Sequence, residues 1–295
     1  MRLDRINVIV HNNFQRTEII RKIDKNKFMN RKWLRPFYYI TTVVFALLFG
    51  LIMLIFHPLQ MLGLSIGYKW HKLAVDVMKF CMNQVVVFSG NTISVKNLAG
   101  DLPTDKPMII VSNHQSMYDI PVIGWALRKH HPKYIAKDSL AKGFPSISYN
   151  IRNGGSIFID RKNSREATRK ILDFCKYLND NNRAGCIFAE GRREKDGKML
   201  PLKKHGLSVM LKKMPEATIV PVALENFWRL EENKLFPVPF GYKFKCTILP
   251  EIDRSKFDNN DDVIYEIERQ IRLFLNQPLE NKIKEASDLL KSPDV

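Results

Sequence analysis

A histidine and an aspartate stand five residues apart in the segment 112–119, which reads SNHQSMYD. A loop of this length can let the carboxylate of Asp119 accept a hydrogen bond from one imidazole nitrogen of His114. The other nitrogen is then left to take a proton from a bound alcohol. This pair would be a general base with its orienting group, and it needs no protein nucleophile. Such a spacing also arises by chance, and Asp119 could simply cap the following helix.

Three arginines follow hydrophobic segments that have the character of strands. Arg161 follows 155–160, and Arg192 and Arg193 follow 186–191. In α/β sheets, ligands collect where strands end, so we expect these arginines to converge near His114. Guanidinium groups suit phosphate because they donate paired hydrogen bonds. For any single arginine, the alternative is a solvated position on the surface.

The last two thirds of the chain alternates short β-type segments with helical ones, which is typical of an α/β domain. Apolar residues recur at helical spacing in 167–178 and again in 264–274. We therefore predict a central, mostly parallel sheet flanked by helices. The predicted strands are 108–111, 156–159, 186–189, 218–223 and 243–249.

An apolar stretch precedes this domain. Residues 37–68 contain no Lys, Arg, Asp or Glu, and 37–56 alone is about long enough to span a bilayer core. The stretch starts too late and is too long for a cleaved signal peptide. We expect Pro58 to interrupt it, and the apolar residues of 70–81, with lysines among them, predict a helix at the membrane interface.

Both flanks of this stretch are basic. Residues 1–35 carry ten Lys or Arg against three acidic residues, and the chain after Lys96 is basic as well. The positive-inside rule draws both flanks to the cytosol, which favours a re-entrant or monotopic helical hairpin over a single crossing. We expect a basic segment 1–36, membrane-associated helices in 37–95 and an α/β domain in 96–295 on the cytosolic face. In a bacterium this would be the inner membrane.

The composition points to an anionic partner. Lys and Arg total 47 against 30 Asp and Glu, a net charge of +17, which suits phosphate-bearing lipid, an anionic membrane or nucleic acid. The basic segment 192–213 would fit a surface-binding module, but no nucleic-acid-binding motif is present, so we expect no nucleic acid partner. The four cysteines lie far apart without a C-x-x-C pair, which predicts neither a zinc site nor a disulfide framework.

Taken in order, these segments resemble the four motifs of the glycerolipid acyltransferase family, the 1-acylglycerol-3-phosphate acyltransferases. The resemblance covers roughly 37–250. Lys137 stands where the family often has a lysine, and Lys204 with Gly206 resembles its Lys-x-Gly. The matching residues, motif by motif, are Asn113, His114 and Asp119; Gly155, Phe158, Ile159, Asp160 and Arg161; Phe188, Glu190, Gly191 and Arg193; and Val220 and Pro221.

The resemblance implies that His114, held by Asp119, deprotonates an acceptor hydroxyl that attacks the thioester of acyl-CoA or acyl-carrier protein. The implied acceptor is the sn-2 hydroxyl of lysophosphatidic acid and the product is phosphatidic acid, as in phospholipid biosynthesis. A thioester is already activated, so no cofactor or metal is expected. The residues implied to bind substrate are Asn113, Lys137, Arg161, Glu190, Gly191, Arg193, Lys204 and Pro221.

The chain departs from the family pattern in its third motif, which usually reads Phe-Pro-Glu-Gly-Thr-Arg. Here Ala189 and Arg192 replace the proline and the threonine, and Lys203 stands where an aromatic residue is common. Another lysophospholipid or a lyso-amino lipid is therefore an alternative acceptor. A basic lipid-binding protein of the membrane surface is the non-enzymatic alternative, which the intact His114 and Asp119 disfavour.

Overall fold

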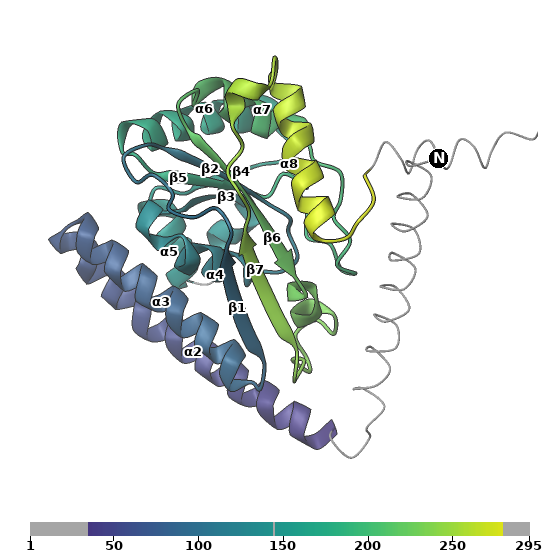
Figure 1. Ribbon diagram of the computed structural model, residues 1–295. Helices are drawn as coiled ribbons and strands as arrows, with labels where there is room; N and C mark the ends of the chain where they lie inside the picture. Colours follow the sequence, from purple (N-terminus) through teal and green to yellow (C-terminus); the bar gives the residue numbers. More distant parts are fainter. Residues whose placement is uncertain (1–34, 144, 280–295) are drawn as a thin grey trace, which may run out of the picture.

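A seven-stranded sheet organises the chain in this computed structural model, which describes residues 35–143 and 145–279 (Figure 1). Neighbouring strands run parallel except β6 and β7, which are antiparallel. The carboxyl ends of β2, β3, β4, β5 and β6 therefore share one edge. In spatial order the strands are β1 (Thr92–Asn97), β7 (Lys243–Ile248), β6 (Thr218–Glu225), β2 (Met108–Ser112), β5 (Ala184–Ile187), β3 (Lys133–Lys137) and β4 (Ile157–Ile159).

Each face of the sheet carries its own hydrophobic core. In β2, Met108 and Ile110 belong to one core and Ile109 and Val111 to the other, because successive side chains alternate between faces. A strand buried on both faces needs the continuous apolar run that this one has. The predicted fold class is thus confirmed. The helices are α2 (Arg35–Ile66), α3 (Tyr68–Phe88), α4 (Asp119–Ala126), α5 (Pro145–Asn153), α6 (Ser164–Asp180), α7 (Lys204–Lys213) and α8 (Asn260–Phe274).

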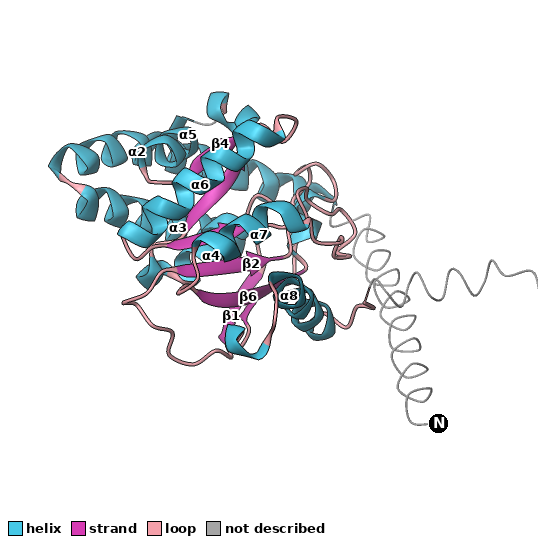
Figure 2. Ribbon diagram, turned by 90° about the horizontal axis from the view of Figure 1, so that it is seen from above, coloured by secondary structure: helices cyan, strands magenta, loops and turns pink. Residues whose placement is uncertain are grey.

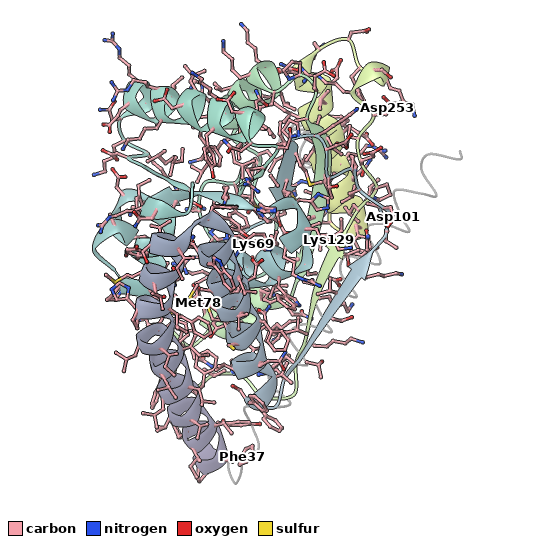
Figure 3. The ribbon with its side chains drawn as sticks, turned by 90° about the vertical axis from the view of Figure 1, so that its left-hand side faces the viewer. Phe37, Lys69, Met78, Asp101, Lys129 and Asp253 are labelled. Atoms are coloured by element: carbon pink, nitrogen blue, oxygen red, sulfur yellow. The ribbon has the colours of Figure 1, made fainter. Side chains whose placement is uncertain are left out.

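Helices α2 and α3 form the predicted hairpin, on the side of the sheet away from α8 (Figures 1 and 2). The reversal occurs at Gly67, whose φ of 147° suits glycine. Gly63 lets the arms meet, because a Cβ there would lie 2.9 Å from the backbone of Trp70 and His71. Figure 3 shows Phe37 at one end of the hairpin and Lys69 towards the other.

The expectation that Pro58 interrupts the first helix is wrong, because α2 continues through it to Ile66. Proline removes one amide donor from the helix. Packing on both sides of Pro58 offsets that loss: Phe56 belongs to the core, and the Gln60 side chain donates to Ser146 Oγ of α5 at 2.6 Å.

The hairpin is attached to the domain along one face and exposes the other. Phe45 packs on Tyr118 with ring centroids 5.7 Å apart, and the amide of Val238 donates to Thr42 Oγ1 at 2.8 Å. On the outer face, Leu47 is 68% and Leu54 is 72% exposed. Within the described residues, one helix, Pro36–Ile66, is long and apolar enough to cross a membrane, and only 17% of its most apolar window is buried.

The strand predictions were right in kind and imprecise at their ends. The third strand begins at Ala184 and ends at Ile187, so Phe188 and Ala189 lie beyond it. Strands β1 and β3 were missed. β1 is an exposed edge strand without alternating burial, and β3 has lysines at both ends. The division of the chain at 36 and 95 stays a prediction, although β1 lies across the second boundary.

We expect the outer face of the hairpin to hold the protein in the membrane by hydrophobic insertion. Carbonate or high salt should leave the chain membrane-bound, and detergent should release it. The double variant Leu47→Lys, Leu54→Lys should become extractable by carbonate, because each lysine costs roughly 2.5 to 3.5 kcal/mol in a bilayer core. Leu273→Lys, on the half-exposed surface of α8, is the control and should behave like the parent. Release of the unmodified chain by salt alone would contradict insertion.

Candidate active site

His114 and Asp119 lie together on the turn between β2 and α4. His114 Nδ1 is 2.8 Å from Asp119 Oδ2, and the same oxygen accepts from the backbone amides of Gln115 and Ser116 at 2.6 and 2.9 Å. Asp119 is fully buried, whereas the imidazole is 13% exposed. Asp119 therefore holds the loop before it as well as the imidazole, and it is more than a helix cap.

The imidazole is also fixed from its face. The ring of His114 stacks on Phe188, with centroids 4.1 Å apart and 17° between the planes. Because a carboxylate only accepts, the bond to Asp119 places a proton on Nδ1 in the neutral imidazole and leaves Nε2 as the acceptor. This arrangement can remove a proton from an alcohol held at Nε2.

Glu190 binds the backbone of the catalytic turn. Its Oε1 accepts from the amide of His114 at 2.7 Å and its Oε2 from the amide of Leu200 at 2.8 Å. Burial raises the pKa of Glu190 to about 8, against the lowering effect of these two amide bonds, and the nearby charge of Asp119 raises it further. The substrate-binding role expected for Glu190 stays a prediction, since both oxygens already contact the protein backbone.

Asn113 joins the end of β2 to the end of β6. Its side-chain amide donates to the Leu224 carbonyl at 2.9 Å, and its carbonyl oxygen accepts from the Leu224 amide at 2.8 Å. Pro221 lies earlier in β6, paired with Val111, and its carbonyl accepts from Leu249 at the end of β7. Both residues are buried, so their contacts in the structure position the strands that carry His114.

Arg161 and Arg193 converge at the turn after β5. The Arg161 guanidinium donates to the carbonyl of Gly191, whose φ of 75° suits glycine. A Cβ at Gly191 would also meet the Lys203 side chain at 3.0 Å. Partial burial and then the charge of Arg193 lower the pKa of Arg161. Mutual repulsion of this kind is relieved when an anion binds between the cations.

Glu231, which sequence reasoning missed, ties this cationic turn to the histidine loop. It accepts from the Arg193 guanidinium and, at 2.8 Å, from the backbone amide of Met117. Glu231 follows β6 in a short 3₁₀ helix, Phe227–Glu231. A lone glutamate in a loop gives no spacing signal. Only the neighbourhood of β6 and β2 in the sheet brings it here.

The two predicted lysines have different positions. Lys137 is the last residue of β3 and pairs with Ile159, the last residue of β4, two residues before Arg161. It therefore lies at the same sheet edge as His114. Lys204 begins α7 and forms an exposed ion pair with Asp261 of α8 at 2.8 Å. The described contacts connect Lys204 to the helices rather than to the histidine loop.

No cluster of three or more His, Cys, Asp or Glu that could hold a metal ion occurs within 35–143 and 145–279. The four cysteines are free thiols, and three of them are buried. The chemistry described above uses the side chains of His114 and Asp119.

Comparison with known proteins finds acyltransferases similar to the part of the chain that contains this site. A family model described as Acyltransferase matches residues 94–225, which contain all four sequence motifs. The 1-acyl-sn-glycerol-3-phosphate acyltransferase of Cocos nucifera is 22% identical over 251 residues, covering 84% of this chain and 78% of that protein. The Helicobacter pylori protein of the same name is 35% identical over 130 residues, covering 43% and 52%.

The fold also occurs in a solved structure. The crystal structure of the 1-acyl-sn-glycerophosphate acyltransferase PlsC from Thermotoga maritima superposes with a TM-score of 0.64 at 20% identity. The match covers 79% of this chain and 95% of that one. It therefore includes nearly the whole fold of that protein.

We expect Glu190→Gln to reveal the raised pKa of Glu190 as a pH dependence of stability. The folded state holds a proton on Glu190 more tightly than the unfolded state, so this group favours folding at low pH and loses that contribution as pH rises from about 4.5 towards 8. The Tm of the parent minus the Tm of Glu190→Gln should therefore decrease as pH rises through this range, with both proteins measured in the same detergent. A difference that grows with pH would contradict a raised pKa. Glu216→Gln, at an exposed position, should give a flat difference.

Proposed function

Because this chain belongs to the glycerolipid acyltransferase family and is an acyltransferase, we propose that it acylates the sn-2 hydroxyl of lysophosphatidic acid to make phosphatidic acid. The acyl donor would be the thioester of acyl-CoA or acyl-carrier protein. The observation that carries the proposal is the oriented His114–Asp119 pair beside the arginines at Gly191. The relatives named above support the choice of acceptor.

In the proposed reaction, His114 acts as general base. Its Nε2 accepts the proton of the acceptor hydroxyl as that oxygen attacks the thioester carbonyl carbon. The carbon–sulfur bond then breaks, the electron pair stays on sulfur, and the departing thiolate takes the proton from the imidazolium. Asp119 stabilises the transient imidazolium at 2.8 Å and keeps the ring in place.

Arg161 and Arg193 are proposed to bind the phosphate of the acceptor. Two guanidinium groups beside one glycine turn offer several donors to a phosphate monoester. Glu231 holds Arg193 and the backbone of Met117 at once, so an anion at Arg193 would be fixed relative to the histidine loop. This geometry could bring a hydroxyl near the phosphate to His114.

We also propose that the hairpin lies in one leaflet, with the catalytic domain on the cytosolic face. Its inner face is occupied by the domain and its outer face is apolar, as leaflet insertion requires. A helix that crossed the membrane alone would need lipid around its whole circumference, and α2 packs on α3 and α5. Acceptor and product would then stay near the bilayer surface.

Loss of the base tests the mechanism. His114→Ala should lower the rate of transfer from acyl-CoA to lysophosphatidic acid by about 10² to 10⁴-fold, the usual contribution of general-base catalysis. Asp119→Asn should lower kcat more than it raises KM, because it disturbs the base rather than substrate binding. His205→Ala, on the exposed surface of α7, is the control and should keep full activity. A folded His114→Ala protein with substantial turnover would rule the mechanism out.

Removing the arginines tests the acceptor. Arg161→Ala and Arg193→Ala should each lower kcat/KM for lysophosphatidic acid by about ten to a hundredfold, since a charge-assisted contact contributes roughly 1.5 to 3 kcal/mol. Lysine at either position should restore part of the loss, because it keeps the charge without the fork. The KM for the thioester should change little.

A zwitterionic lysophospholipid and an outside arginine provide the controls for this experiment. Activity with lysophosphatidylcholine, if present, should fall much less than activity with lysophosphatidic acid. Arg165→Ala, exposed on α6, should match the parent with both acceptors. Equal losses with both acceptors would mean that Arg161 and Arg193 hold the fold or the donor, and lysophosphatidic acid would lose its place as the preferred acceptor.

A further inference from the structure

A second group of cations lies at the sheet edge opposite His114. Lys133 is the first residue of β3 and Arg183 immediately precedes β5, so both are at the amino ends of parallel strands. His114 follows the carboxyl end of β2, which runs parallel to β5. Lys72 and Lys79 reach the same place from α3. These four cations, called here the amino-edge cluster, are therefore separate from the candidate active site.

One tyrosine brings the cluster together. The Arg183 guanidinium lies 4.3 Å and the Lys133 ammonium 5.0 Å from the ring centre of Tyr68. Lys133 also donates to the Tyr68 hydroxyl at 3.1 Å. The Arg183 guanidinium contacts His131 Nδ1, and burial together with the surrounding cations lowers the pKa of His131 to about 3. His131 is therefore neutral and adds no further charge at physiological pH.

The acidic side chains lining this region do not balance the cations. Among the described residues that line the pocket beside the cluster, Asp76 is the one carboxylate. It pairs closely with Lys72 and lies 3.7 Å from Lys79, which leaves Lys133 and Arg183 without a carboxylate partner in the described structure. Lys133 is only 8% exposed, and Arg183 Nε is buried without a hydrogen-bond partner. Buried charge of this kind is costly unless it is paired. Burial, and then the charges of Lys79 and Arg183, accordingly lower the pKa of Lys133 to about 7, and an anion bound here would favour its charged form.

The pocket can admit part of a small anion. Its cavity volume is only about 20 Å³, enough for one oxygen of such an anion, and the rest of the anion would lie in the solvent-exposed mouth of the pocket. We propose that it binds a phosphate group, carried either by the headgroup of a bilayer lipid or by free phosphate. Its described lining residues are Lys72, Val75, Asp76, Lys79, His131, Pro132, Lys133, Asn150, Gly154 and Ser156.

The position of the pocket is compatible with a lipid source. Lys72, Asp76 and Lys79 lie on one side of α3, and the exposed apolar residues Trp70, Leu73 and Val77 lie next to them on the same helix. If that apolar surface enters a leaflet, the pocket mouth would lie near the level of the headgroups. The chain before β3 adds the cations Arg128 and Lys129, which raise the local concentration of anions.

A purely structural role is the competing explanation, in which the cations only pack on the Tyr68 ring. Cation–π contacts stabilise a fold whether or not an anion is present. A phosphate site instead makes stability depend on phosphate, because a ligand that binds only the folded state raises Tm. The two explanations therefore differ in whether phosphate raises the Tm of the protein, and a Tm measured without phosphate would not separate them.

The first experiment uses the full chain in an uncharged detergent, with sodium phosphate compared with sodium chloride at equal ionic strength. At about ten times Kd, phosphate should raise the Tm of the parent by roughly 3 to 6 °C. The double variant Lys133→Gln, Arg183→Gln should lose most of this shift. Lys72→Gln changes a partly exposed side chain and should reduce the phosphate-dependent rise in Tm. It provides the test if the double variant does not fold.

Two controls isolate the pocket. Lys176→Gln, Lys212→Gln removes the same charge from exposed positions of α6 and α7 and should keep the full shift. Arg161→Ala weakens the proposed acceptor site and should keep most of the phosphate-dependent rise in Tm. The result at the amino-edge cluster therefore does not depend on whether the proposed function is correct. A shift that survives in both Lys133→Gln, Arg183→Gln and Lys72→Gln but disappears in Arg161→Ala would overturn the proposal.

The second experiment identifies the source of the phosphate. The parent and variants are floated with phosphatidylcholine vesicles that contain or lack phosphatidylglycerol. If the site binds a lipid headgroup, the double variant Lys133→Gln, Arg183→Gln should lose several-fold more phosphatidylglycerol-dependent binding than the charge-matched control Lys176→Gln, Lys212→Gln. Inorganic phosphate should then also reduce the binding of the parent to these vesicles. If the site binds free phosphate instead, the two double variants should bind vesicles equally. Only Lys133→Gln, Arg183→Gln should then lose the phosphate-dependent rise in Tm. Equal behaviour of the two double variants in both experiments would overturn the site.

Discussion

One buried carboxylate oxygen, Oδ2 of Asp119, accepts hydrogen bonds from His114 and from the amides of Gln115 and Ser116. A buried carboxylate is expensive unless such donors surround it. If Asp119 were lost, the two amides and the imidazole would all lose their acceptor, and the turn between β2 and α4 would lose its shape. The imidazole of His114, the loop that contacts Glu231 and the start of α4 therefore all depend on this one group.

Three acidic residues near the His114 loop bind groups of the protein itself, whereas two groups of cations lie at opposite edges of the sheet. Asp119 and Glu190 bind backbone amides of the catalytic turn, and Glu231 links that turn to Arg193. Their carboxyl oxygens are therefore directed towards groups of the protein itself. The excess of positive charge remains available at both edges, where phosphate-bearing molecules can meet it.

The sequence predicted what depends on local pattern. The His114–Asp119 contact and the sheet followed from spacing and hydrophobicity, because a short loop and a buried strand constrain their own residues. Long-range partners did not follow. Asn113 bonds to Leu224, 111 residues away, and Arg183 meets Tyr68 only because β5 and α3 reach the same edge. The end of α2 was also misjudged, since the packing that carries the helix through Pro58 comes from residues far along the chain.

The hairpin and the catalytic turn are mechanically one unit. Phe45 and Phe49 of α2 lie with their ring centres 5.7 and 6.4 Å from that of Tyr118, the residue next to Asp119. Tyr118 is fully buried, and close-packed interiors transmit displacement rather than absorb it. The depth to which the outer face of α2 enters a membrane would therefore set the height of His114 above the lipid. In the mechanism that we propose, an acceptor anchored by its own acyl chain would then meet His114 by lateral diffusion, without leaving the bilayer.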